Sequence, residues 1–270
     1  SHSRSRSGRK SMARSSALPV PYNGWQAVGA SLRTHDRAFR VHPLVRSAGT
    51  SLHGLTAEVI DLGRGTPEEF EAHRDDIKGR IVLVRHELMF AAGTIHRRRK
   101  IEMAQAAGAV GFLIASPQPG LLVTGSSGRD SGPGIPGLAI TGEAAQALRR
   151  TASGWPSATM VIETREQPTV TETLVAEIPG AGDGWIVLSA HIDGHDINES
   201  AMDNASGVAA ALSILRSVAS HVRSWRRGLR VMFFSVEEWA LTGSAQYVRG
   251  LAQAETASIA LNVNLDSVGG

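Results

Sequence analysis

In the last third of the chain, short apolar runs alternate with a helical pattern, and the runs stop at acidic residues or histidine. Alternation of strand and helix predicts a parallel sheet covered on both faces. The carboxyl ends of parallel strands meet at one edge of such a sheet, where ligands bind. We therefore expect the polar residues at the ends of these runs to lie together. They are His191, Asp193, Asp203, Glu237, Glu238 and Asp266.

One imidazole and several carboxylates make a hard set of nitrogen and oxygen ligands for a divalent metal ion. Zinc is the leading candidate. A single histidine at the end of a strand is more often structural, so the inference depends on the whole constellation. The pattern predicts a hydrolase.

The bulk composition sets outer limits on the fold. The chain has 270 residues, enough for two compact units, and its 42% hydrophobic and 20% charged residues are typical of a globular protein. No apolar run approaches the roughly 18 residues that span a bilayer, so no membrane span is expected. Cysteine is absent, which excludes disulfides and thiolate metal ligands but leaves the compartment open.

The positive charge is concentrated at the N-terminus. Residues 1–16 hold five basic side chains and no acid, and the rest of the chain has a net charge of −2. We therefore expect no nucleic-acid partner. The tail has no apolar periodicity and is predicted to be disordered, and no secretory signal is visible.

The strand and helix patterns divide the chain into four parts. Residues 17–50 are interrupted by proline and arginine and are expected to be irregular. The next part alternates short strands and helices around an apolar core. The basic run 97–100 at the front of one of these helices is expected to be a solvated face. The expected parts are 1–16 (basic tail), 17–50 (a segment associated with the last part), 51–168 and 169–270.

The third part resembles a protease-associated (PA) domain. The likeness is carried by 77–84 (IKGRIVLV), 104–114 (AQAAGAVGFLI) and 135–141 (IPGLAIT), in that order. The resemblance implies a non-catalytic domain beside a peptidase cleft. We accordingly expect an α+β PA-like domain inserted into the rest of the fold.

The last part resembles the M28 peptidases of clan MH, which are zinc aminopeptidases. The segments 201–207 (AMDNASG) and 237–244 (EEWALTGS) carry the likeness, while 44–50 and 55–59 are similar to the plasma glutamate carboxypeptidase branch. That branch tends to have DDGG where this chain has DNAS at 203–206, so its substrate class does not carry over. The resemblance implies an α/β/α sandwich with a mostly parallel central sheet.

The resemblance also implies a role for each site residue. His191 and Glu238 would bind one zinc ion, Asp266 the other, and Asp203 would bridge both. Asp193 would hold the His191 ring in its ligating tautomer. Because neighbours on an extended backbone point to opposite sides, Glu237 would be free to act as general base and acid.

The family's second metal site takes a further histidine well beyond the position of Asp266. The chain ends at Gly270, so it is expected to be the N-terminal half of the peptidase domain, with a truncated sheet and an incomplete second zinc site. Among nearby residues, His195, Asp196 and Glu199 are expected in a solvated loop, and Trp239 to pack near the cleft.

These observations predict a zinc metallopeptidase, an exopeptidase that acts on peptides or dipeptides. Two alternatives stay open: a non-catalytic receptor-like homologue, and a single-zinc acyltransferase similar to glutaminyl cyclase. The resemblance leaves room for a homodimer and favours a secreted or periplasmic location.

Overall fold

The computed structural model describes residues 13–88, 91–129, 132–150, 152 and 154–269. The chain forms two compact units. Residues 23–168 make a continuous inserted unit, and the segments on either side of it, up to Tyr22 and from Thr169, make a discontinuous unit. The first boundary therefore lies near residue 22, whereas the sequence suggested one near residue 50.

The inserted unit is built on a parallel sheet in the order β4-β5-β6-β7. β3 pairs antiparallel with β7 at one side, and the first part of β8 pairs antiparallel with β4 at the other. The strands are β3 (Val41–Pro43), β4 (Leu55–Asp61), β5 (Ile81–Arg85), β6 (Gly111–Ala115), β7 (Gly137–Ile140) and β8 (Ser157–Ile178).

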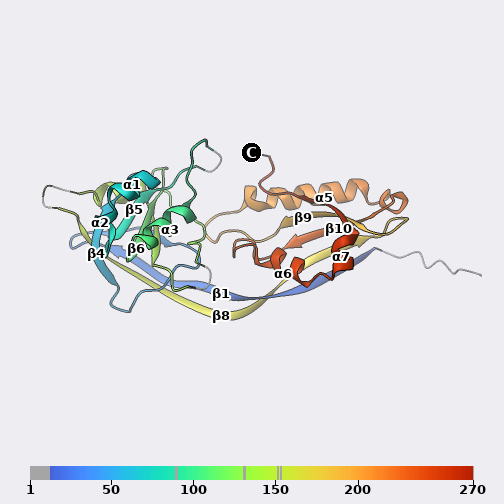
Figure 1. Ribbon diagram of the computed structural model, residues 1–270, viewed down its shortest axis with the longest axis horizontal. Coiled ribbons are helices and arrows are strands. Elements are labelled where there is room, and N and C mark those ends of the chain that lie inside the picture. The colour runs from blue at the N-terminus through green and yellow to red at the C-terminus, as the bar shows by residue number, and fades with distance from the viewer. Residues whose placement is uncertain (1–12, 89–90, 130–131, 151, 153, 270) are drawn as a thin grey trace, which may run out of the picture. The chain divides into compact units, whose positions relative to one another are not determined.

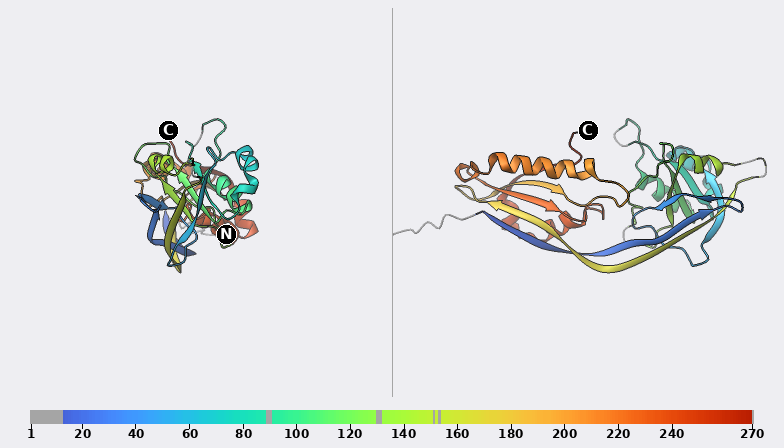
Figure 2. Two further views of the ribbon diagram at one scale, coloured as in Figure 1. Left: turned by 90° about the vertical axis from the view of Figure 1, so that its left-hand side faces the viewer. Right: turned by 180° about the vertical axis from the view of Figure 1, so that it is seen from behind.

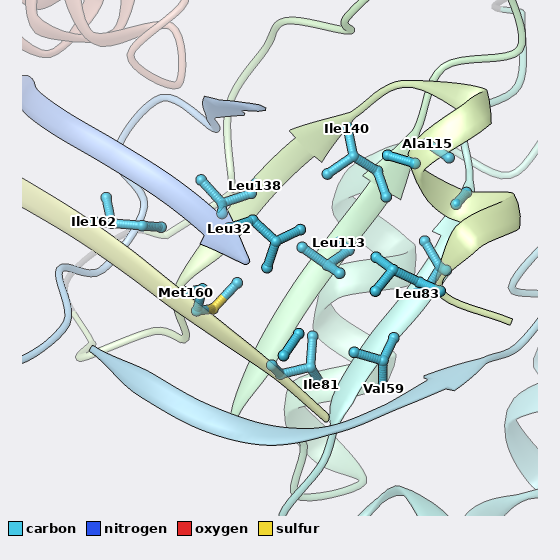
Figure 3. Packing of buried hydrophobic residues seen from close by; sticks show 14 residues of the cluster. Leu32, Val59, Ile81, Leu83, Leu113, Ala115, Leu138, Ile140, Met160 and Ile162 are labelled. Carbon is cyan, nitrogen blue, oxygen red and sulfur yellow. The ribbon is translucent and has the colours of Figure 1, made fainter. Parts of the chain in front are cut away.

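Both faces of this sheet are buried, which is why its strands are nearly continuous apolar runs. Alternate residues of β5 point to opposite faces. Ile81 and Leu83 join a cluster with Met160 of β8, whereas Val82 and Val84 join a second cluster with Ile101. Figure 3 shows the first cluster, in which the side chains of several strands converge.

Capping residues mark the ends of the short helices in the inserted unit. Thr66 and Glu69 form a capping box at the start of α1, and Thr141 caps α4. Gly108, with a φ of 83°, follows the end of α3 in the left-handed region that favours glycine. The helices are α1 (Pro67–Ala72), α2 (Arg74–Ile77), α3 (Arg97–Ala106) and α4 (Gly142–Ala147).

The discontinuous unit has a mixed sheet in the order β11-β9-β10-β8. β9 pairs parallel with both β10 and β11, and β10 pairs antiparallel with the last part of β8. The elements are β9 (Trp185–His191), a π-helical turn (Ala201–Ser206), α5 (Gly207–Val218), a 3-10 turn (Val222–Ser224), β10 (Gly228–Phe234), α6 (Thr242–Gly250), α7 (Gln253–Ser258) and β11 (Ile259–Asn264).

Helices cover both faces of this sheet, as the predicted α/β/α sandwich requires. Leu188 of β9 packs with Ala211 of α5 on one face, and Val187 of β9 packs in a cluster with Tyr247 of α6 on the other. Figure 1 shows α5 and α6 on opposite sides of β9 and β10, and the right-hand view of Figure 2 shows α5 running along the strands.

The N-terminal region differs from its prediction. Residues 17–50 are not irregular: they contain β1 (Arg14–Arg33), β2 (Ala38–Phe39) and β3. β1 pairs with β8 despite the prolines that interrupt it. Arg14, Ser15 and Ser16 of the predicted tail already belong to β1, and residues 1–12 lie outside the described residues.

The prediction of a solvated face for residues 97–100 holds for Arg98 and Arg99, whose side chains are exposed, but is wrong for Lys100. The side chain of Lys100 is fully buried beside Glu87, and Arg97 donates to the carbonyls of Thr124 and Ser126. A buried charge that finds a partner can occupy a core position, and composition alone does not reveal that partner. Among the described residues, no helix has both the length and the hydropathy needed to cross a membrane.

Candidate metal centre

His191 lies at the carboxyl end of β9 and is buried. β9 is flanked by β10 and β11, so the imidazole occupies the edge where ligands bind in open parallel sheets. Its Nδ1 lies 3.0 Å from the backbone carbonyl oxygen of Asp193. Its Nε2 lies 3.0 Å from Oδ1 of Asp203 and 3.7 Å from Oδ1 of Asp266. The ring therefore has one nitrogen fixed by the backbone and one directed at two carboxylates.

Asn204 holds the segments that carry Asp203 and Asp266 next to each other. Its side-chain amide donates to the Leu265 carbonyl at 3.0 Å, and its Oδ1 accepts from the backbone N–H groups of Gly207 and Ser267 at 3.0 and 3.2 Å. The Asp203–Asn204 peptide bond is cis. The sequence identified Asn204 only as part of a motif, and its role in holding the two segments together was not predicted.

Gly207 shows why the chain after Asn204 needs a residue without a side chain. A Cβ there would lie 2.3 Å from both Asn204 Oδ1 and the Leu265 carbonyl oxygen, closer than packed atoms allow. The close approach of Leu265 is also what brings Asp266 to the histidine. The Asn-x-x-Gly spacing was the signal available in the sequence.

Glu237 and Glu238 lie in a turn after β10, not on an extended backbone, so that part of the expectation was wrong. Val236, with a φ of 51°, starts the turn in the left-handed region. The carboxylate of Asp193 accepts the backbone N–H of Glu237 at 3.0 Å and that of Glu238 at 3.1 Å. Asp193 thus fixes the turn through its side chain and the His191 ring through its carbonyl.

Glu238 pairs with a histidine that the sequence reasoning placed in solvent. Its Oε2 lies 2.9 Å from Nε2 of His195, whose side chain is only 14% exposed, so the expectation of a solvated His195 was wrong. Asp196 and Glu199 of the same loop are exposed, as expected. Trp239 packs edge-on against Tyr22, with ring centroids 6.0 Å apart.

Burial and the close packing of carboxylates shift the pKa values of Glu237 and His191. Burial raises the pKa of Glu237 to about 7, helped by the charges of Glu238 and Asp193. Burial opposes protonation of His191, but its contact with Asp193 and the charges of Glu237, Asp193 and Asp203 raise its pKa to about 9. Such uncompensated negative charge around one imidazole is what a divalent cation would neutralise.

The donor set fits a metal ion such as zinc. One ligand atom each from His191, Asp203 and Asp266 lie within 4.8 Å of one another. An imidazole and carboxylates, without thiolates, are a ligand set that catalytic zinc sites use. Glu238 is not part of this group of three. Its Oε1 is buried and, within the described part of the chain, has no hydrogen-bond partner.

Comparisons with known proteins agree with this geometry. Residues 173–270 match the model of peptidase family M28, and residues 42–148 match that of the PA domain. Aminopeptidase YwaD of Bacillus subtilis is 29% identical over 228 residues, which cover 83% of this chain and 46% of the relative. Carboxypeptidase Q of Homo sapiens is 27% identical over 245 residues, which cover 85% and 51%.

A solved structure shows the same fold. The chain is similar to a zinc aminopeptidase from Bacillus subtilis with a TM-score of 0.72 and 25% identity, over 94% of this chain and 59% of that one. The chain spans about half the length of the curated relatives it matches. The predicted resemblance to M28 peptidases with a PA domain is confirmed. The chain thus carries a segment similar to peptidase family M28 together with a PA domain.

Proposed function

We propose that this chain provides the catalytic edge of a zinc-dependent exopeptidase that hydrolyses peptides or dipeptides. The observation that carries the proposal is the buried His191. Its Nδ1 is fixed by a backbone carbonyl, and its Nε2 faces the carboxylates of Asp203 and Asp266. The zinc aminopeptidase from Bacillus subtilis with the same fold supports the choice of metal.

In this proposal four residues hold zinc in the complete enzyme, which would contain two ions. They are His191, Asp203, Glu238 and Asp266. Zinc supplies a Lewis acid that polarises the scissile carbonyl and lowers the pKa of bound water. Glu238 would need to exchange its contact with His195 for the metal, and the unpartnered Oε1 of Glu238 supports this assignment.

Glu237 is the proposed general base and acid. Burial and neighbouring carboxylates raise the pKa of Glu237 to about 7, where a carboxylate can both accept and return a proton near neutral pH. Asp193 is the proposed positioning residue because its carboxylate fixes the backbone of Glu237 and Glu238. Together these residues can hold a proton acceptor beside the metal ligands.

Zinc titration of the purified chain, residues 1–270, tests the proposal independently of activity. We expect one tight equivalent, because the described residues form one three-ligand group. His191→Ala should abolish it, while Glu237→Gln should retain it. Glu199→Gln, an exposed acid in the neighbouring loop, is the matched control and should have no effect. Zinc binding that does not depend on His191 would refute the assignment.

Assays on the full-length protein separate the classes of function. A zinc exopeptidase should release amino acids from unblocked peptides. A receptor-like homologue should release none, and an acyltransferase should cyclise or transfer without hydrolysis. Failure of hydrolysis with zinc bound at His191 would therefore reject the peptidase activity but keep the metal site.

A further inference from the structure

Four arginines surround a hollow in the inserted unit. The hollow has a volume of about 570 Å³ and lies at the carboxyl ends of the neighbouring parallel strands β4 and β5. Asp61 ends β4 and Arg85 ends β5. This is the edge at which open α/β sheets bind ligands. The hollow is lined by Asp61, Gly63, Arg64, Glu69, Arg85, Arg149 and Arg150.

Arg85 has a hydrogen-bonding group that the protein leaves unused. Its Nη2 donates to Oδ2 of Asp61 at 2.6 Å. Its Nη1 is buried and has no hydrogen-bond partner among the described residues. Buried donors are almost always paired, and a guanidinium donor is among the most unfavourable to leave unpaired. This donor is therefore open to an acceptor that is not part of the described chain.

The acidic side chains of the hollow are already occupied. Asp61 Oδ2 is shared between Arg85 and Arg149, while its Oδ1 accepts the backbone N–H of Gly63. Both oxygens of Glu69 accept backbone N–H groups, from Arg64 and Thr66. Arg64 is paired with Glu87, so Arg85, Arg149 and Arg150 are the cations that face the two committed carboxylates, and the hollow keeps an excess of positive charge.

Arg150 is presented in a way that suits recognition of a carboxylate. Its guanidinium lies 5.3 Å from the ring centre of Trp155, on which Arg80 also stacks at 4.1 Å. An arginine that stacks on a ring keeps the edge donors of its guanidinium available. Arginines that follow a helix such as α4 also interact favourably with the helix dipole. That interaction supplies no hydrogen-bond acceptor for Arg85 Nη1.

We propose that this hollow binds an acidic segment of a peptide or protein, with Arg85 Nη1 donating to one carboxylate and Arg149 and Arg150 contacting a second. Arg85 is held by Asp61 and Arg150 lies over Trp155, so the two guanidinium groups are held by different partners, which suits a segment that carries more than one carboxylate. A nucleic acid would need cations that follow a long run of phosphates, whereas the arginines here gather at a single hollow that also contains Asp61 and Glu69. The site lies outside the metal centre and does no chemistry.

Calorimetric titration of residues 1–270 tests the proposal. The probe is an acetylated, amidated hexapeptide of aspartate and glutamate, compared with its asparagine and glutamine counterpart. We expect one equivalent of the acidic peptide to bind, and the neutral peptide not to bind. Arg85→Gln should weaken binding by about tenfold or more, because one charge-assisted hydrogen bond is lost.

The double variant Arg149→Gln/Arg150→Gln should weaken binding similarly. Both residues are exposed, so this variant tests the site without disturbing the core. Arg74→Gln, an exposed arginine elsewhere in the same unit, is the control and should bind as the parent does. Three results would each overturn the proposal: no binding of the acidic peptide, equal binding to all variants, or inorganic phosphate binding as tightly and displacing the peptide.

Discussion

The ion pair of Lys100 and Glu87 gives the sharpest test of what stabilises the inserted unit. Lys100 is 0% exposed, and its Nζ lies 2.6 Å from Oε2 of Glu87 and 2.9 Å from the Arg85 carbonyl oxygen. Glu87 also accepts Nε of Arg64 at 2.9 Å. The two partners are therefore unequal: Glu87 has a second cation, and Lys100 has no second carboxylate in the ion pairs described.

This asymmetry predicts unequal effects of the two substitutions. Glu87→Gln leaves a buried ammonium facing only neutral groups and should lower the free energy of unfolding by about 3–5 kcal/mol. Lys100→Met keeps the aliphatic length and leaves Glu87 paired with Arg64, so we expect a loss of about 1–2 kcal/mol. The double variant should lose about as much free energy of unfolding as Lys100→Met, because it leaves no buried charge without a partner.

Urea denaturation followed by circular dichroism and tryptophan fluorescence measures these differences. Glu102→Gln on the same helix, α3, is the control: Glu102 makes an exposed pair with Arg98 and should matter by less than about 0.5 kcal/mol. Burial lowers the pKa of Lys100, so the loss in Glu87→Gln should shrink at high pH, where the amine can shed its proton. A larger loss from Lys100→Met than from Glu87→Gln, or strict additivity in the double variant, would refute the reasoning.

Three further predictions concern the site, the PA domain and pH. In the full-length enzyme, Glu237→Gln should retain zinc while turnover falls by about 10²–10⁴-fold, and loss of zinc would mean that Glu237 and Glu238 are interchanged. Lys100→Met, assayed where it is folded, should hydrolyse a small chromogenic amide at the parental rate, because the PA domain does no chemistry. Burial, with the charges of Arg97 and Lys100, lowers the pKa of His86 from 6.5 to about 4. The unfolded chain then binds more protons at this position, so the stability of the parent relative to a His86→Gln variant should fall as pH drops from 6.5 towards 4, and a difference that does not change with pH would contradict this.

The sequence was sufficient to predict most of the strands and the position of the site. Each β-strand of the inserted unit from β4 to β7 follows an apolar run bounded by glycine or a turn, and α3 ends just before Gly108. The polar residues at the strand ends do meet, since His191, Asp203 and Asp266 form one group. Parallel pairing brings strand ends together whatever the loop lengths, and this is why the inference works.

What the sequence could not provide was the partner of each long-range contact. Nothing in the local pattern shows that Asp193 accepts the backbone of Glu237 and Glu238, more than forty residues away. Likewise β1 pairs with β8, and its prolines made the segment look irregular. His195 faces Glu238 because a loop folds inward, and loop conformation depends on tertiary contacts that periodicity does not encode.

The insertion of residues 23–168 between two parts of one unit has a consequence for how the chain acquires its structure during synthesis. The inserted unit is continuous in sequence and can fold as soon as it leaves the ribosome. Residues 14–22 complete their contacts only later. Leu18 packs with Val187, and the carbonyl of Pro21 accepts a hydrogen bond from Gln246. Val187 and Gln246 are both synthesised much later than residues 14–22. Folding of the insertion shortens the effective loop between these segments and so lowers the entropy cost of joining them. The sheet edge that carries His191, Asp203 and Asp266 is therefore completed only after the inserted unit has been made.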